Sequence, residues 1–104
     1  MKDAIHKLNK LFENKLRLGI MSLLMVNDAV SYNELKQQLN DPNKPLTDGN
    51  LASHLKKLRE SDYIEETKEF RNRKPHTTYR TSKEGKKAFE AHLSALEEII
   101  KGLG

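Results

Sequence analysis

The sequence predicts a mainly helical α+β fold with one small β-hairpin, and three observations carry this prediction. Apolar residues recur at helical spacing in four stretches before residue 62. A run rich in Tyr, Ile, Thr and Phe follows, which favours strands, and the stretch after residue 81 again has helical spacing. The chain has 104 residues, 36% hydrophobic and 33% charged. One domain over residues 1–104 with a modest core is therefore expected, which excludes a two-domain enzyme.

The first two helices are expected at residues 3–13 and 14–26. The apolar residues at helical spacing in the first are Ile5, Leu8, Leu11 and Phe12. The first residue of the second, an asparagine, is a suitable N-cap. The apolar face of this second helix contains Leu16, Ile20, Leu23 and Leu24. Arg17 lies on the same helix and is expected to be structural, with Glu13 or Asp28 as the candidate partners.

Two further helices are separated by a loop that contains proline. Ser31 and Glu34 have the spacing of a capping box, in which each side chain accepts a bond from a free backbone N–H. This spacing predicts a helix that begins at Ser31 and runs to residue 39. Residues 40–45 contain two prolines in four positions, which a helix does not continue through. Thr47 is then the expected N-cap of a helix over 47–61, with Leu51, Leu55 and Leu58 buried.

A β-hairpin and a long helix complete the chain. Residues 63–70 and 77–81 hold the strand-favouring side chains, so residues 71–76 are expected to form the tip of the hairpin. Ser82 is the expected N-cap of the last helix, which runs to Lys101. At about 1.5 Å per residue this helix is about 30 Å long.

The positive charge of the chain is concentrated on the hairpin. No acidic residue occurs among residues 70–82, whose basic residues are Arg71, Arg73, Lys74 and Arg80. Together with Lys83 they carry +5, more than the net +4 of the whole chain. Arginine offers a rigid fork of donors that suits phosphates and base edges. The pattern therefore favours contact with nucleic acid, and the alternative is a hairpin tip that is simply solvated.

The helix before the hairpin has an outward face without carboxylates. At about 100° per residue, the face opposite the three leucines holds Gly49, Asn50, Ser53, Lys56 and Lys57. Asparagine reads adenine edges and lysine reaches phosphate or guanine, so this face suits a helix in a DNA major groove. An ordinary solvated helix face accounts for the same residues. His54, at the shoulder of this face, is expected to be mainly structural.

Three segments, "NKLRLGIMSLL", "LASHLKKLRESDYI" and "YRTSKEGKKAF", occur in an order that resembles the small winged-helix transcriptional regulators related to MarR and ArsR. The resemblance covers residues 14–93. It implies a winged helix-turn-helix with a supporting helix at 31–40, a recognition helix at 47–61 and a wing at 63–81. Two features depart from the family. The turn "NDPNKPLT" is longer than usual, and Asp62 stands where glycine is common, although aspartate tolerates left-handed geometry less well.

The resemblance and the charge pattern together predict a transcriptional regulator that binds double-stranded DNA. The recognition helix is expected to read base edges, while the wing contacts the backbone or the minor groove. The expected DNA-binding residues are Thr47, Asn50, Ser53, His54, Lys57, Arg71, Arg73, Lys74 and Arg80. The alternative is a winged helix that serves as a protein–protein interaction module, in which the basic hairpin binds an acidic partner.

Residues 1–13 and 82–104 are expected to be dimerisation helices. The apolar stripe along the last helix is too broad for a small domain to cover easily. The expected dimer contacts are Ile5, Leu8, Phe12, Phe89, His92, Leu96, Ile99 and Leu103. Similar regulators dimerise through terminal helices, so the resemblance implies a homodimer. The alternative is that the two terminal helices pack on each other within one chain.

No enzymatic, cofactor or metal site is expected. The chain has no cysteine, its histidines lack ligand spacing, and it has no nucleophile–base pair or glycine-rich phosphate loop. The longest apolar stretch, residues 20–26, is too short to cross a membrane, and the N-terminus lacks the features of a secretory signal. A cytoplasmic, DNA-associated protein without a membrane partner is expected. A small-molecule effector is compatible with the sequence but not indicated by it.

Overall fold

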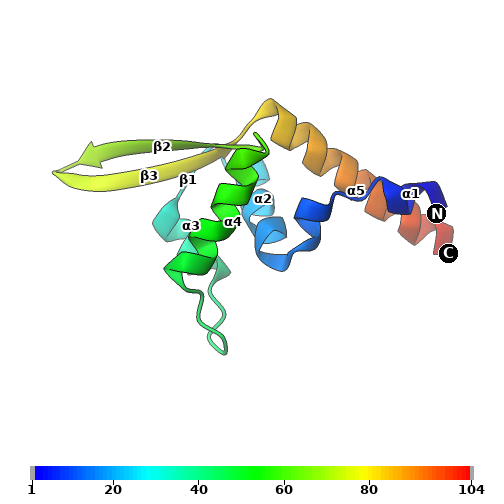
Figure 1. Ribbon diagram of the computed structural model, residues 1–104, viewed down its shortest axis with the longest axis horizontal. Coiled ribbons are helices and arrows are strands. Elements are labelled where there is room, and N and C mark those ends of the chain that lie inside the picture. Colours follow the sequence, from blue (N-terminus) through cyan, green and yellow to red (C-terminus); the bar gives the residue numbers. More distant parts are fainter. Residues whose placement is uncertain (1, 104) are drawn as a thin grey trace.

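The structure is a computed structural model that describes residues 2–103, with the side chains of residues 3–102. Figure 1 shows a central group of helices, a two-stranded β-ribbon that extends to one side and a long helix that extends to the other. The chain measures 54 × 34 × 21 Å along its principal axes. The tip of the ribbon and the two chain ends therefore lie at opposite ends of the longest axis.

Helices form most of the chain, and three strands form one small sheet. The helices are α1 (Lys2–His6), the 3₁₀ helix η1 (Lys10–Glu13), α2 (Lys15–Val26), α3 (Tyr32–Leu39), α4 (Asp48–Glu60) and α5 (Lys83–Leu103). The strands are β1 (Val30–Ser31), β2 (Ile64–Arg71) and β3 (Lys74–Thr81). They pair antiparallel in the order β1-β3-β2. The predicted class, mainly helical with a small β-hairpin and a long last helix, is confirmed.

The predicted helix starts are confirmed by their capping hydrogen bonds. Asn14, Thr47 and Ser82 each accept a bond from a backbone N–H two or three residues later, at 2.9–3.1 Å. At α3 the Ser31 hydroxyl accepts from the Glu34 N–H at 3.1 Å and donates to the Glu34 carboxylate at 3.0 Å. The carboxylate therefore bonds to the hydroxyl, and not to the backbone N–H that the capping box predicts.

The expected helix over residues 3–13 is interrupted at Asn9. The Asn9 side chain accepts from the Leu11 N–H at 3.0 Å and so caps η1. Its own N–H is donated at 2.9 Å to Nδ1 of His92 in α5. A continuous helix would have used that N–H internally, and the segment therefore splits into α1 and η1.

Residues 30–31 form a strand that the sequence does not predict. Val30 pairs with Tyr79 and Ser31 pairs with Thr78, which makes β3 the central strand. A strand of two residues is too short to show an alternating pattern. Its strand character depends on the presence of β3 beside it.

The turn of the hairpin is shorter than expected. Strand pairing continues to Arg71 and Lys74, so the predicted tip over residues 71–76 is wrong. Only Asn72 and Arg73 form the turn, with φ of 52° and 64°. Positive φ at both positions is typical of a type I′ turn, which matches the twist of the strands. Arg73 takes a position that favours glycine, at a cost of about 1 kcal/mol.

α4 ends in a Schellman motif at the left-handed residue Asp62, which has φ of 60°. The Asp62 N–H bonds to the Arg59 carbonyl at 2.9 Å, and the Tyr63 N–H bonds to the Leu58 carbonyl at 3.0 Å. The Ser82 hydroxyl donates to the Asp62 carbonyl at 2.5 Å. Aspartate is one of the few non-glycine residues that visit this geometry. The departure from the family pattern at this position therefore leaves the helix end intact.

One apolar core joins the helices to the base of the sheet. Its largest fully buried side chains are Phe12, Ile20, Met21, Leu24, Leu35, Leu51, Leu55 and Leu58. The predicted inward face of the helix before the hairpin is confirmed, because all three of its leucines are in this group. Val30, Ile64 and Tyr79 extend the core onto the inner face of the sheet.

Phe12 lies in an aromatic cluster within the chain. Its ring centroid is 5.2 Å from that of Phe89 and 5.5 Å from those of Tyr63 and His92. Phe12 is 1% exposed, and Phe89 and His92 are each 3% exposed. The expectation that these three side chains form dimer contacts is corrected, because burial inside one chain leaves them no surface for a second.

α5 is the longest helix, with 21 residues, and α1 lies along it. The two terminal helices thus pack on each other within one chain, which is the alternative that the sequence left open. Leu103 was expected at the dimer contact, but its side chain lies outside the described residues. None of the helices within residues 2–103 combines the length and the apolar character needed to cross a membrane.

His92 holds the N-terminal segment to α5 through a bond that requires a neutral ring. Its Nδ1 accepts the Asn9 N–H, so this nitrogen carries no proton. Burial lowers the pKa of His92, and the charge of Glu13 opposes this shift in part. Protonation of Nδ1 would remove the hydrogen bond.

We expect the free energy of unfolding to fall as the pH falls from about 7.5 to about 5. The pKa of His92 is lower in the folded chain, so the unfolded chain binds more protons. The contribution of neutral His92 to stability is complete above the pKa of about 6.5 that histidine has in the unfolded chain. It is lost as the pH falls below that value, by at most about 1.4 kcal/mol per pH unit. Thermal unfolding across this range should show a smaller fall in Tm for His92→Gln than for wild type. Equal falls would contradict the assignment, and His6→Gln, at an exposed position, is the control.

Candidate nucleic-acid interface

α4 presents one face to the core and the opposite face to solvent. Its buried leucines lie on one side, and the helical repeat of about 100° per residue places the intervening positions on the other. This outer face of α4 consists of the exposed residues Gly49, Asn50, Ser53, Lys56 and Lys57. Within the described part of the chain, none of its side chains makes a hydrogen bond or an ion pair. Amide, hydroxyl and ammonium groups are therefore available to a partner.

The first turn of α4 leaves space for close approach. The Thr47 Oγ1 accepts from the Asn50 N–H at 3.1 Å, and its hydroxyl hydrogen remains available as a donor. A Cβ added at Gly49 would meet no atom within 4 Å, and no glycine of the described residues has positive φ. Neither crowding nor backbone geometry thus requires glycine at this position. A glycine that the fold does not require fits a site where another backbone approaches closely.

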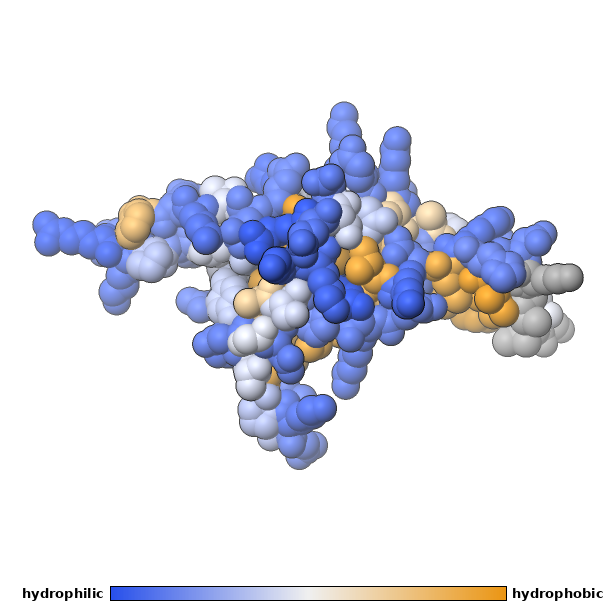
Figure 2. All heavy atoms as spheres, viewed as in Figure 1, coloured by the Kyte–Doolittle hydropathy of each residue, from blue (hydrophilic) through white to orange (hydrophobic). Residues whose placement is uncertain are grey.

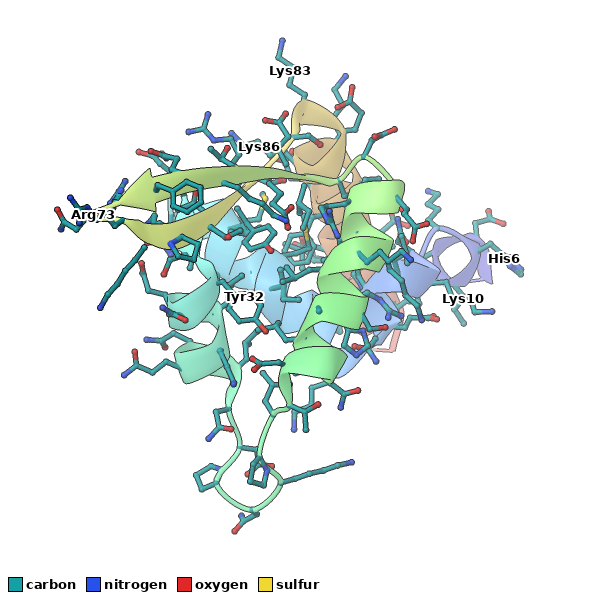
Figure 3. The ribbon with its side chains drawn as sticks, turned by 60° about the vertical axis from the view of Figure 1, so that its left-hand side comes forward. His6, Lys10, Tyr32, Arg73, Lys83 and Lys86 are labelled. Carbon is teal, nitrogen blue, oxygen red and sulfur yellow. The ribbon has the colours of Figure 1, made fainter. Side chains whose placement is uncertain are left out.

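A cluster that no sequence pattern predicts ties α4 to α3. The Tyr32 hydroxyl donates to Oδ1 of Asp48 at 2.8 Å, and Nζ of Lys36 bonds to the same oxygen at 2.8 Å. Figure 3 shows Tyr32 between the two helices. The Lys36 bond first, then that of Tyr32, lowers the pKa of Asp48. Burial and then the bond to Asp48 raise the pKa of Tyr32 to about 12.

This α3–α4 cluster has two consequences for the outer face. It sets the position of the start of α4 relative to α3, because both partners of Asp48 belong to α3. It also compensates the one carboxylate in the first turn of α4, which would otherwise repel an anionic partner. The only sequence signal was the four-residue spacing of Tyr32 and Lys36, which places both on one face of α3.

His54 lies half-buried at the edge of the outer face, with Nδ1 2.9 Å from Nη1 of Arg17. A guanidinium only donates, so Nδ1 is the acceptor and Nε2 carries the proton. Burial first, then the charges of Arg17 and Lys57, lower the pKa of His54. Nε of Arg17 donates to a backbone carbonyl of η1 at 2.7 Å. The expected pairing of Arg17 with Glu13 or Asp28 is therefore wrong, because Arg17 instead links η1, α2 and α4.

The end of α4 is tied to the sheet through Glu66. Nη1 of Arg59 lies 3.4 Å from one carboxylate oxygen of Glu66, and the Tyr79 hydroxyl donates to the other at 2.6 Å. Nζ of Lys68 lies 3.7 Å from the first oxygen. Burial, followed by the Glu66 bond, raises the pKa of Tyr79. These contacts set the direction of the β2–β3 ribbon, called the wing below, relative to α4.

Three of the predicted basic residues gather at the tip of the wing. Arg71 and Lys74 are cross-strand partners next to the turn, and Arg73 is in the turn itself. All three are exposed and make no ion pair within the described residues, and Figure 3 shows Arg73 at the outermost end. The unfavourable φ of Arg73 places a guanidinium where a glycine would relieve strain. The tip is therefore a concentrated, unpaired positive charge.

Arg80 lies apart from the other predicted basic residues. It is six residues from Lys74 along β3, or about 20 Å at the rise of a strand. It lines a shallow hollow of about 390 Å³ at the base of the wing, together with Asp28 and Lys86. The structure thus groups the predicted residues into the start and outer face of α4, the wing tip, and this separate position.

The surface suits the binding of an extended anion. Figure 1 shows α4 in front of the other helices, with the wing leading away from its C-terminal end. Within the described residues, no group of three His, Asp or Glu side chains could hold a metal ion. The arrangement offers donors on a helix and cations on a ribbon at two separate positions.

Comparisons with known proteins agree with this geometry. Residues 16–100 match the family model described as a winged helix DNA-binding domain. An uncharacterized protein of Methanocaldococcus jannaschii is 32% identical over 94 residues, which are 90% of this chain and 97% of that protein. The structure of a transcriptional regulator homologue from Pyrococcus horikoshii OT3 matches with a TM-score of 0.81 and 28% identity, over 99% of this chain and 98% of that one.

A more distant neighbour shares the fold alone. It is a transcriptional regulator of the MarR family from Porphyromonas gingivalis W83, with a TM-score of 0.64 and 24% identity. The match covers 88% of this chain and 80% of that one.

We expect Gly49→Ala to stabilise the folded chain, because the new methyl group meets no atom and the helix loses a flexible residue. The gain should be about 0.5 kcal/mol, or an increase in Tm of about 2–4 °C. Thermal denaturation of the two proteins measures it. Gly85→Ala is the contrasting variant, since its Cβ would clash with the Tyr63 carbonyl oxygen, and it should lower Tm. A lower Tm for Gly49→Ala would show that the fold requires this glycine.

Proposed function

Because this chain belongs to the winged helix DNA-binding domain family, we propose that it is a transcriptional regulator that binds specific sites on double-stranded DNA as a homodimer. The observation that carries the proposal is the outer face of α4. Its polar side chains have no partner within the described chain, whereas the neighbouring charged residues Asp48 and Arg59 are held by α3 and β2. The transcriptional regulator homologue from Pyrococcus horikoshii supports the same class of function.

α4 is the recognition helix of this proposal and enters the major groove. Asn50 and Ser53 reach base edges, because an amide bonds adenine in a bidentate manner and a hydroxyl serves as donor or acceptor. Thr47 and Lys57 contact phosphates on either side. Gly49 lets the backbone of the first turn approach the DNA. His54 keeps its Nε2–H as a donor for a phosphate while its Nδ1 remains bonded to Arg17.

The wing contributes charge more than base recognition. Arg71, Arg73 and Lys74 neutralise phosphates beside or within the adjacent minor groove, which positions the complex. Arg80 lies at the base of the wing. It contacts DNA in this proposal only if the duplex extends along the ribbon as far as this position. The alternative function, a protein-interaction module, has no observation that favours it over DNA.

We expect binding that depends strongly on salt. If a dimer neutralises about 8 phosphates, log K against log salt has a slope of about −7. Selection of duplexes from a random pool at two salt concentrations, followed by titration of the selected site, measures both specificity and slope. Arg73→Ala should weaken binding to all sequences and make the slope less steep by about 1. Asn50→Ala should change the preference at one base position, at a cost of about 1–3 kcal/mol.

Lys10→Ala is the matched control for these variants. Lys10 is exposed in η1 and lies away from the wing tip, as Figure 3 shows, so both affinity and slope should remain unchanged. Binding that is insensitive to salt, or a chain that forms a stable complex with an acidic protein but not with DNA, would reject the proposed function.

The homodimer in this proposal forms through α1 and α5. Figure 2 shows apolar surface at the end of the molecule that these helices form. Ile5, Leu93 and Ile100 are exposed there, and the expected contacts Leu8, Leu96 and Ile99 are half-buried. A second copy that covers this face removes it from water. A two-fold pair would also present two recognition helices to half-sites about 34 Å apart.

We expect a mass of about twice the 12.0 kDa of one chain in sedimentation or light scattering. Ile100→Glu should shift the protein to monomer, because a buried unpaired carboxylate is costly at an apolar contact, and it should abolish cooperative binding to a two-half-site duplex. Ile100 is 67% exposed, so the fold of one chain does not depend on it. Val26→Glu, at a position 80% exposed on α2, is the control. A wild-type monomer that binds a single half-site would contradict the dimer.

A further inference from the structure

One large apolar side chain stands exposed on the wing. Phe70 is 80% exposed, and the other exposed large apolar residues are on α1, α2 and α5. Phe70 is not part of the core cluster, and the wing on which it lies extends beyond the helices (Figure 1). An aromatic ring in water is unfavourable by roughly 2 kcal/mol relative to a buried one. A partner that covers the Phe70 ring would therefore gain binding free energy.

The strand register places this ring on the same side of the sheet as the helices. Alternate residues of a strand share a face, so Phe70 lies on the face of Ile64 and Glu66. Ile64 is buried against the helical core, and Glu66 bonds to Arg59 of α4. In Figure 2 one orange patch stands on the wing among blue side chains, on the side of the molecule from which α4 is seen in Figure 1. The exposed ring and the outer face of α4 can thus meet one ligand.

Pro75 lies directly across from Phe70 and widens the apolar surface. The two residues are register partners in the second pair from the turn. An antiparallel ladder alternates between hydrogen-bonded and non-hydrogen-bonded pairs, and Phe70 and Pro75 form a pair of the second kind. In such a pair the backbone nitrogens point away from the partner strand. The outer side of β3 at Pro75 is not covered by β1, which pairs only with Thr78 and Tyr79. The missing N–H of Pro75 therefore breaks no strand hydrogen bond. The result is an exposed apolar pair one position from the two-residue turn.

Positive charge predominates around this apolar surface, which favours an anionic partner. Arg73 is in the turn beside it, and Lys68 shares its face of β2, 3.7 Å from Glu66. Arg71 and Lys74 lie at the tip on the opposite face, together with Glu69. The nearest carboxylate on the same face, Glu66, is already bonded to Tyr79 and Arg59. Proteins that enter the DNA minor groove commonly use arginines or lysines there and insert an apolar side chain between two base steps.

We propose that Phe70 is an apolar wedge that enters the DNA minor groove, packs on the sugar edges and partly unstacks one base step. This inference rests on the proposed function. Arg73 contacts a phosphate beside the ring, and Arg71 and Lys74 extend the positive charge on the other face of the wing while the ring occupies the groove. Because the cost of unstacking depends on the base step, Phe70 makes the wing sensitive to sequence without a hydrogen bond to any base. Flexible steps such as TA are favoured at this position.

The test uses the selected duplex with 2-aminopurine at each step beneath the wing. Wild type should raise the fluorescence at one step, and Phe70→Ala should abolish that rise and lower affinity about tenfold. The slope of log K against log salt should stay the same, because no charge is removed. Phe70→Leu should keep most of the affinity. Val26→Ala is the matched control, since Val26 is equally exposed, at 80%, and it should change nothing.

The outcomes separate this inference from the proposed function. Wild-type protein that does not bind duplex DNA overturns both. Wild-type protein that binds with the expected salt slope, while Phe70→Ala keeps full affinity and the fluorescence change, overturns the wedge alone. A Phe70→Ala protein that loses capture of an acidic protein and binds DNA as wild type assigns the ring to a protein partner and also overturns the wedge. Unchanged thermal unfolding of Phe70→Ala, expected from its exposure, confirms that the variant is folded.

Discussion

The burial of the leucine face of α4 is the constraint on which the candidate interface depends. Leu51, Leu55 and Leu58 pack into the core with α2, and the helical repeat then directs Asn50, Ser53 and the lysines outward. No interaction with the outer face is needed to hold it in place. This arrangement leaves the outer face free to match a partner while the inner face supplies the stability.

Polar contacts then determine which charges remain available. Asp48 is bound by Tyr32 and Lys36, and Glu66 is bound by Tyr79 and Arg59. One acidic group at the start of α4 and one on the adjacent strand β2 are thus compensated within the chain. Lys57 and the cations at the wing tip have no such partner in the described residues. The surface is positive because of how charges are paired, more than because of the modest net charge of +4.

The sequence predicted the elements that local chemistry specifies and missed those that depend on distant partners. Caps such as Asn14 and Thr47 and the apolar faces of the helices were predictable, since each is specified within a few residues. β1 was not, because its two residues form a strand only beside β3. The strand pairing that continues to Arg71 and Lys74 was not predicted, because the composition of residues 71–76 is typical of a loop. Phe12 also has the spacing of a surface stripe, and only the ring of Phe89 shows that it is a core residue.

The sequence by itself determined the fold class, the inward and outward faces of α4 and the concentration of positive charge on the hairpin. These follow from periodicity and composition, which are local properties of the chain. Only the tertiary structure decided which charges are neutralised, which apolar residues are left outside, and on which side of the molecule Phe70 stands. Those depend on the packing of segments far apart in the chain, as when Arg17 meets His54 or Asn9 meets His92. Side chains such as these take their partners from the folded arrangement, because no local pattern specifies contacts over such separations.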